Sequence, residues 1–112
     1  MIPKTPWVDP IVFDLVHLLS HERLHNYHDW IKVGYCLHNI SPDLLDLWDE
    51  ISQVCDENHC EKYFPGHCAA QWRKMDNNHP NALTIRSLHY WARQDNPEGY
   101  ANLLNELLPP IM

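Results

Sequence analysis

The side chains best suited to chemistry in this sequence are five sulfur and imidazole donors within fourteen residues. They are Cys55, His59, Cys60, His67 and Cys68, in a polar and irregular stretch. Thiolate sulfur and imidazole nitrogen are ligands that tetrahedral zinc prefers, but Cys-x4-Cys followed by an adjacent His and Cys is not a usual zinc-knuckle spacing. Cys55 and Cys68 also fit the apolar stripes of the flanking helices, where reduced cysteine behaves as a small hydrophobe. We therefore expect no zinc and no other cofactor, and keep a zinc-stapled loop as the alternative.

The sequence lacks the common patterns of a nucleotide-hydrolysing or polymerising site. No Gly-x-x-x-x-Gly-Lys-Ser/Thr phosphate loop occurs. Polymerase-type metal chemistry needs closely paired carboxylates, and no Asp-x-Asp or Asp-x-Glu pair is present. Asp43, Asp46, Asp49 and Glu50 instead follow one solvated side of an expected helix. We expect no catalytic residues in this chain.

Basic side chains are the remaining candidates, as ligands of phosphate. Arg86 and Arg93 are seven residues apart on one expected helix, so they share a face with an offset of roughly 20°. Lys32, Arg73 and Lys74 lie on other expected helices. We predict nucleic-acid contacts from these five residues, and an ordinary solvated surface is the alternative.

Helical patterns that would position these side chains cover most of the chain, whereas no strand pattern is present. Asp9-Pro10, Ser41-Pro42-Asp43, Thr84 and Asn96-Pro97 are typical helix starts, with a capping side chain or a proline at the first position. The expected helices begin near residues 10, 27, 42, 68, 84 and 97. Six short helices with short joins predict an all-α, compact bundle with a single core.

Tryptophan is the residue expected to build that core. Trp30, Trp48, Trp72 and Trp91 lie on the apolar stripes of four expected helices, and a buried indole removes a large area from water. Gly34 in the middle of a helix costs about 1 kcal/mol against alanine. We expect a close approach between two helices at Gly34, and the four indoles in one core.

Length and charge limit the class of protein. At 112 residues the chain is one domain, with ends at 1–9 and 109–112 that look like linkers excised from a longer protein. Its net charge of −7 opposes a free-standing nucleic-acid binder, because phosphate contacts supply most of that affinity. No apolar run reaches the ~20 residues that span a bilayer, and no secretion signal is visible. We expect an intracellular, reducing compartment and no membrane partner.

The order and spacing of several motifs between Ile11 and Tyr100 resemble one family. It is the second type of primase C-terminal domain, the helical domain that follows the polymerase core in viral and plasmid primase-helicases. The likeness is strongest to the versions in large DNA viruses of eukaryotes. The matching segments are Arg23-x6-Trp30-x2-Val33-Gly34-x2-Leu37-His38-Asn39, Trp48-x3-Ser52, Cys68-x3-Trp72, and Leu83-Thr84-Ile85 through Trp91-Ala92-Arg93 with Asp95-Asn96-Pro97.

This resemblance implies an accessory role beside a primase core and a hexameric helicase. The implied partners are the polymerase and helicase domains of the same parent chain, with single-stranded DNA template and nucleotide held weakly during primer initiation. The implied location is the viral replication site in the host cell. The family fixes no DNA-contacting residue, so Arg86 and Arg93 are inferred from their helix alone. A protein-interaction or spacer module without nucleic-acid contact is the alternative function.

Overall fold

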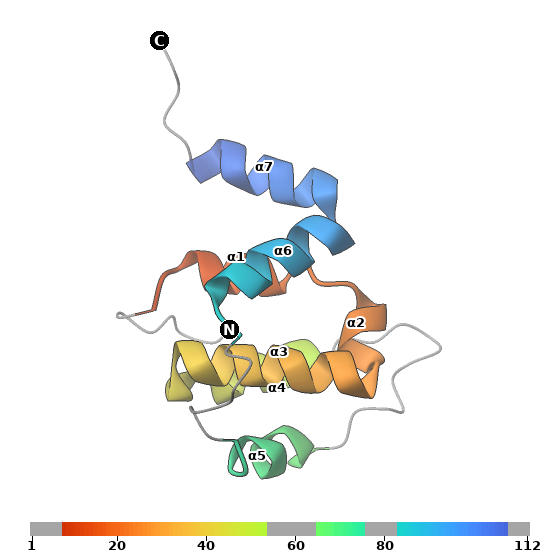
Figure 1. The fold of residues 1–112 in the computed structure, drawn as a ribbon, viewed down its shortest axis with the longest axis vertical. Helices are drawn as coiled ribbons and strands as arrows, with labels where there is room; N and C mark the ends of the chain where they lie inside the picture. The colour runs from red at the N-terminus through yellow and green to blue at the C-terminus, as the bar shows by residue number, and fades with distance from the viewer. Residues whose placement is uncertain (1–7, 54–64, 76–82, 108–112) are drawn as a thin grey trace.

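The computed structural model describes residues 8–53, 65–75 and 83–107. Within these ranges the chain is all-α, with no strand (Figure 1). The elements are α1 (Ile11–Val16), α2 (His21–His25), α3 (Tyr27–Ile40), the 3-10 turn η1 (Pro42–Leu44), α4 (Leu45–Ser52), α5 (His67–Trp72), α6 (Ile85–Asp95) and α7 (Pro97–Leu107). The predicted fold class is confirmed. The described part has seven α-helices where six were expected, because the turn after Ser20 is a helix of its own.

Polar side chains cap most of these helices at their first residues. The Ser20 and Asn26 side chains accept hydrogen bonds from the first turns of α2 and α3. Thr84 and Ser87 form a reciprocal capping box at the start of α6. Asn96 Oδ1 accepts from the backbone N of Gly99, 2.9 Å away, at the start of α7. These caps explain why the helix starts could be recognised from the sequence.

The helices are stacked in layers around α3 (Figure 1). One side of α3 packs against α6, and its other neighbours are α2, α4 and α5. α1 also packs against α6, whereas α7 has its main contact with α6 and lies at one end of the stack, opposite α5 (Figure 1). None of the described helices combines the length and the apolar character needed to cross a bilayer.

The four expected tryptophans belong to one core, which confirms that prediction. Trp30, Trp48, Trp72 and Trp91 are each at most 9% exposed and lie in the same cluster of buried residues. Trp48 is at its centre, 4.7 Å from Trp30 and 5.7 Å from Trp72 between ring centroids. The predicted close approach at Gly34 is also confirmed, because an added Cβ would lie 2.5 Å from Cζ2 of Trp48.

The N-terminal part of the core is larger than its sequence pattern indicates. The spacing of Ile11, Leu15, Leu18 and Leu19 predicts one apolar stripe. In the structure Val12, Phe13 and Val16 are buried beside Leu15, whereas Ile11 is only half-buried. Val8, inside the stretch 1–9 expected to be linker-like, is only 4% exposed. α1 packs against α6 and is buried over most of its circumference, so a single-stripe pattern could not identify its inward face.

Candidate nucleic-acid interface

The outward face of α6 carries two arginines with a tyrosine between them. At roughly 100° per residue, Arg86, Tyr90 and Arg93 fall within a strip about 60° wide. Leu88, Trp91 and Ala92 on the opposite side are buried in the core. Arg86 and Arg93 are exposed, and Tyr90 is 56% exposed. The fold therefore fixes one face of α6 in the core and presents the other to solvent.

This outward face forms one wall of a shallow groove against α7. The groove has a volume of about 210 Å³ and is lined by Arg86, His89, Tyr90, Arg93 and Tyr100. His89 Nδ1 and the Tyr100 hydroxyl are 2.8 Å apart, and their rings meet edge to face at 5.8 Å. This bond joins the two helices at the groove.

The groove is locally positive although the chain is acidic overall. Among the described residues, two guanidinium groups and no carboxylate line it, whereas the whole sequence has a net charge of −7. Among the described residues neither Arg86 nor Arg93 has an ion-pair partner, since the arginine salt bridge there belongs to Arg23. Two arginines without an ion-pair partner in the described ranges, next to the exposed ring of Tyr90, are groups that bind phosphate and stack on bases.

The other predicted phosphate ligands lie elsewhere. Lys32 is exposed on α3, and Arg73 and Lys74 are exposed just after α5. α5 lies at the opposite end of the stack from α6 and α7 (Figure 1). The structure therefore brings Arg86 and Arg93 together and leaves Arg73 and Lys74 on a different surface.

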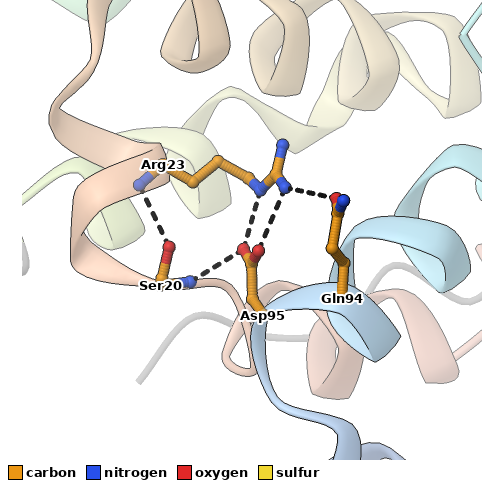
Figure 2. Close-up of polar contacts among 4 residues, drawn as sticks. All are labelled: Ser20, Arg23, Gln94 and Asp95. Atoms are coloured by element: carbon orange, nitrogen blue, oxygen red, sulfur yellow. Dashed lines mark hydrogen bonds and ion pairs between the residues drawn. The ribbon is translucent and has the colours of Figure 1, made fainter.

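A nearly buried ion pair holds the C-terminal end of α6 in place (Figure 2). Arg23 Nε lies 2.7 Å from Asp95 Oδ2, and Arg23 Nη2 lies 3.0 Å from Asp95 Oδ1. The backbone N of Ser20 donates to the same carboxylate at 3.0 Å, and Arg23 Nη2 also donates to Gln94 Oε1 at 3.1 Å. The guanidinium carbon of Arg23 lies 5.3 Å from the ring centroid of Trp91. This cluster ties α2 to α6 one turn from the groove.

The ion pair changes the titration of both partners. Burial alone would raise the pKa of Asp95, but the hydrogen bonds from Arg23 and the Ser20 backbone outweigh it, so the pKa is lowered. The hydrogen bond to Asp95 raises the pKa of Arg23 despite its burial. Both groups are therefore charged at neutral pH. In the sequence, Arg23 and Asp95 stand only within the motifs that resemble the family, and no local pattern indicates that they pair.

The described cysteines are packed as apolar residues. Burial raises the pKa of Cys36 to about 12 and that of Cys68 to about 11, so both thiols are protonated at neutral pH. Cys68 Sγ lies 3.3 Å from the Ser52 hydroxyl, which also accepts from Trp30 Nε1 at 2.8 Å. Cys68 thus fills the helical position that its apolar stripe predicted.

The zinc alternative is only partly visible in the structure. Cys55, His59 and Cys60 lie outside the described residues. The ring of His67 packs against Trp30 with 4.8 Å between centroids. No three His, Cys, Asp or Glu side chains within the described ranges are grouped to hold a metal ion. The absence of bound zinc stays a prediction.

Comparison with known proteins places residues 12–92 in one family. They match the sequence model of the family described as Primase C terminal 2 (PriCT-2). Three similar viral proteins each carry the name "Putative helicase". The one from Acanthamoeba polyphaga mimivirus is 39% identical over 87 residues, 78% of this chain and 8% of that protein.

The other two relatives are less similar in sequence, and this chain again covers a small part of each. The protein of Invertebrate iridescent virus 6 is 33% identical over an alignment of 91 residues that covers 74% of this chain and 9% of the relative. That of Frog virus 3 is 28% identical over an alignment of 107 residues that covers 89% of this chain and 10% of the relative. The chain thus spans about a tenth of the length of these relatives. No solved structure matches it significantly.

Proposed function

The chain belongs to the Primase C terminal 2 (PriCT-2) family, and from that premise we propose that it is a non-catalytic accessory domain of a DNA primase-helicase. It assists the engagement of template or nucleotide during primer initiation and links the polymerase domain to the helicase domain of the same parent chain. The matched relatives, named as helicases and roughly ten times longer, support a parent of this kind.

The observation that carries the proposal is the positive groove between α6 and α7. Arg86 and Arg93 are exposed and unpaired within the described residues, and a tyrosine lies between them. In a chain of net charge −7, long-range attraction to phosphate is weak. Affinity for DNA must then come from a few local contacts and from linkage to the polymerase domain, which raises the effective concentration of template.

The test is a priming assay with the full-length parent protein. Arg86→Ala with Arg93→Ala should leave folding intact, because both side chains are on the exposed face of α6. We expect primer initiation to fall several-fold while extension of a preformed primer changes little. Arg73→Ala with Lys74→Ala is the matched control, since it removes two exposed cations at the far end of the stack. Equal effects of the two pairs would contradict the proposal.

The second candidate function is a spacer or protein-interaction module without nucleic-acid contact. It is favoured by the overall acidic charge and by α7, whose Leu103 and Leu104 are only half-buried. Replacing the whole domain by a flexible linker separates the two functions. Unchanged initiation after that replacement would leave the spacer role alone.

A further inference from the structure

We infer that the groove between α6 and α7 binds single-stranded DNA template rather than the initiating nucleotide, with Tyr90 as the platform on which one base stacks. The inference rests on the proposed function and deepens it, because that function leaves template and nucleotide open. It also assigns a role to Tyr90, which the pattern of basic residues alone does not indicate.

The size and lining of the groove argue against a bound nucleoside triphosphate. Small-molecule sites usually have volumes of ~300–1,000 Å³ and bury most of their ligand, whereas this groove is shallow and measures about 210 Å³. Triphosphates bind with Mg²⁺, which proteins hold through one or two carboxylates, and the described residues that line the groove include no carboxylate. A strand that passes across an open surface needs neither enclosure nor a metal.

The order of side chains on α6 fits a strand. Arg86 and Arg93 are separated by about 10.5 Å along the helix axis at 1.5 Å per residue, and Tyr90 lies between them. A strand along the helix can therefore place phosphates at the two guanidinium groups and one base on the tyrosine ring. Proteins that bind single strands without sequence preference combine a basic track with aromatic rings in this way.

The exposure of Tyr90 supports the same role. Tyr27 and Tyr90 are the exposed large hydrophobic residues of the described chain, at 55% and 56%. Tyr27 touches the rings of His28 and Trp30 on α3. Tyr90 instead lines the groove together with Arg86 and Arg93, for which the described part of the chain offers no ion-pair partner. Tyr27 is therefore a control of equal exposure at a site without the arginines.

The experiment measures binding of the 112-residue chain to a fluorescent oligo-dT strand, to the same strand in a duplex, and to Mg²⁺-ATP, at several low salt concentrations. Tyr90→Ala should weaken single-strand binding roughly tenfold at every salt concentration, because one stacked base is lost. Tyr90→Phe should bind the single strand nearly as tightly as the unchanged chain does, and Tyr27→Ala should leave this affinity unchanged. Duplex should bind more weakly and be insensitive to Tyr90, since its bases are already paired.

The arginines have a different signature in the same titration. Each phosphate contact contributes a slope of ~0.7 to the plot of log affinity against log salt for a single strand. Arg86→Ala with Arg93→Ala should therefore reduce the slope by about 1.4.

The outcomes separate the inference from the proposed function. One result would overturn the template inference and leave the proposed function standing. In it, the chain binds Mg²⁺-ATP, the double arginine variant loses that binding, and Tyr90→Ala does not change DNA binding. Single-strand binding that depends on the arginines and is indifferent to Tyr90→Ala would also overturn the assignment of Tyr90. Binding of neither ligand, even at the lowest salt concentration, would also overturn the inference. If the full-length parent protein with both arginines replaced then primes as well as the unchanged protein, the proposed function is contradicted too.

Discussion

Gly34 is the residue at which the packing of α3 on α4 leaves no room for a side chain. A Cβ there would lie 2.5–2.8 Å from three atoms of the Trp48 indole. That ring is fully buried and stacks on Trp30, so it cannot move away freely. Glycine is thus retained inside a helix, where alanine would be favoured by about 1 kcal/mol in isolation.

Gly34→Ala should consequently destabilise the domain despite the better helix propensity of alanine. We expect a loss of about 1–3 kcal/mol in the free energy of unfolding, the usual cost of overpacking a core. Urea denaturation measures it. Lys32→Ala, at an exposed position of the same helix, should change stability by less than about 0.5 kcal/mol. Equal stability of the two variants would contradict the close approach.

Asp95 is the residue whose titration should couple pH to stability. Its pKa is lowered in the folded state, so its ion pair stabilises fully above the ordinary aspartate value of about 3.9. That stabilisation is lost as pH falls through the lower, folded value. Arg23 has a raised pKa and stays charged throughout this range.

Asp95→Asn should therefore cost stability at pH 7 and progressively less below pH 4. Removing one partner of a buried pair typically costs about 3 kcal/mol or more, and this pair is nearly buried, with side-chain exposures of 14% and 9%. The measured quantity is the difference in unfolding free energy between the unchanged chain and the variant, at pH 7 and near pH 2.5. Taking this difference cancels the contributions of the other carboxylates. A difference in unfolding free energy that stays constant with pH would refute the coupling.

At the scale of elements, α7 depends on α6 for its position. α6 is the main neighbour of α7 in the described part of the chain, and the His89–Tyr100 bond joins the two beside the groove. An element with few partners opens locally more easily than the core does. The shape of the groove therefore depends on one hydrogen bond and on the packing of Tyr100 and Leu103.

Tyr100→Phe should loosen α7 without unfolding the domain. The ring remains while the hydroxyl bond, of about 1 kcal/mol, is lost. Amide hydrogens of α7 should exchange about fivefold faster, whereas those of α3 and α4 should keep their protection. Tyr27→Phe, which removes a tyrosine hydroxyl on α3, is the control. Faster exchange throughout the molecule would indicate global destabilisation instead.

Element boundaries could be predicted where a local signal fixes them. The Thr84 and Asn96 caps act within three residues, so the starts of α6 and α7 follow from their sequence. Ser41 also caps as expected, through the backbone N of Asp43. The first turn there is 3-10, and α4 begins only at Leu45. Local pattern gives the cap but does not distinguish the two helix types in that turn.

At the scale of the whole molecule, contacts between distant residues limited what the sequence could predict. The four tryptophan stripes correctly predicted a shared core, because each stripe is local. Arg23 and Asp95 are separated by 72 residues, and the groove needs α7 to fold back on α6. On a helical wheel Tyr90 falls about 40° from Arg86 and about 60° from Arg93, so the sequence indicates that it shares their face. Its exposure depended on which side of α6 meets the core.

Trp48 is the residue on which the assembled core depends most. It is 0% exposed, and it contacts Trp30, Trp72 and the backbone at Gly34. Its indole Nε1 has no hydrogen-bond partner among the described residues, so its contribution is packing alone. The Trp30 indole differs, because its Nε1 donates to Ser52.

Trp48→Ala should cost about 3–5 kcal/mol, the usual range for deleting a large buried aromatic ring. That is a large part of the ~5–15 kcal/mol that holds a domain of this size folded, so the variant can unfold altogether. Trp48→Phe is the second variant to measure, because it keeps an aromatic ring and removes no hydrogen bond. We expect Trp48→Phe to fold, with a smaller loss of unfolding free energy in urea denaturation, and to bind single-stranded DNA as tightly as the unchanged chain.

A folded Trp48→Ala variant that is nearly as stable as the unchanged chain would contradict a core built around this indole. Lost DNA binding in a stable Trp48→Phe variant would show that the α6–α7 groove depends on the packing at the far side of α3.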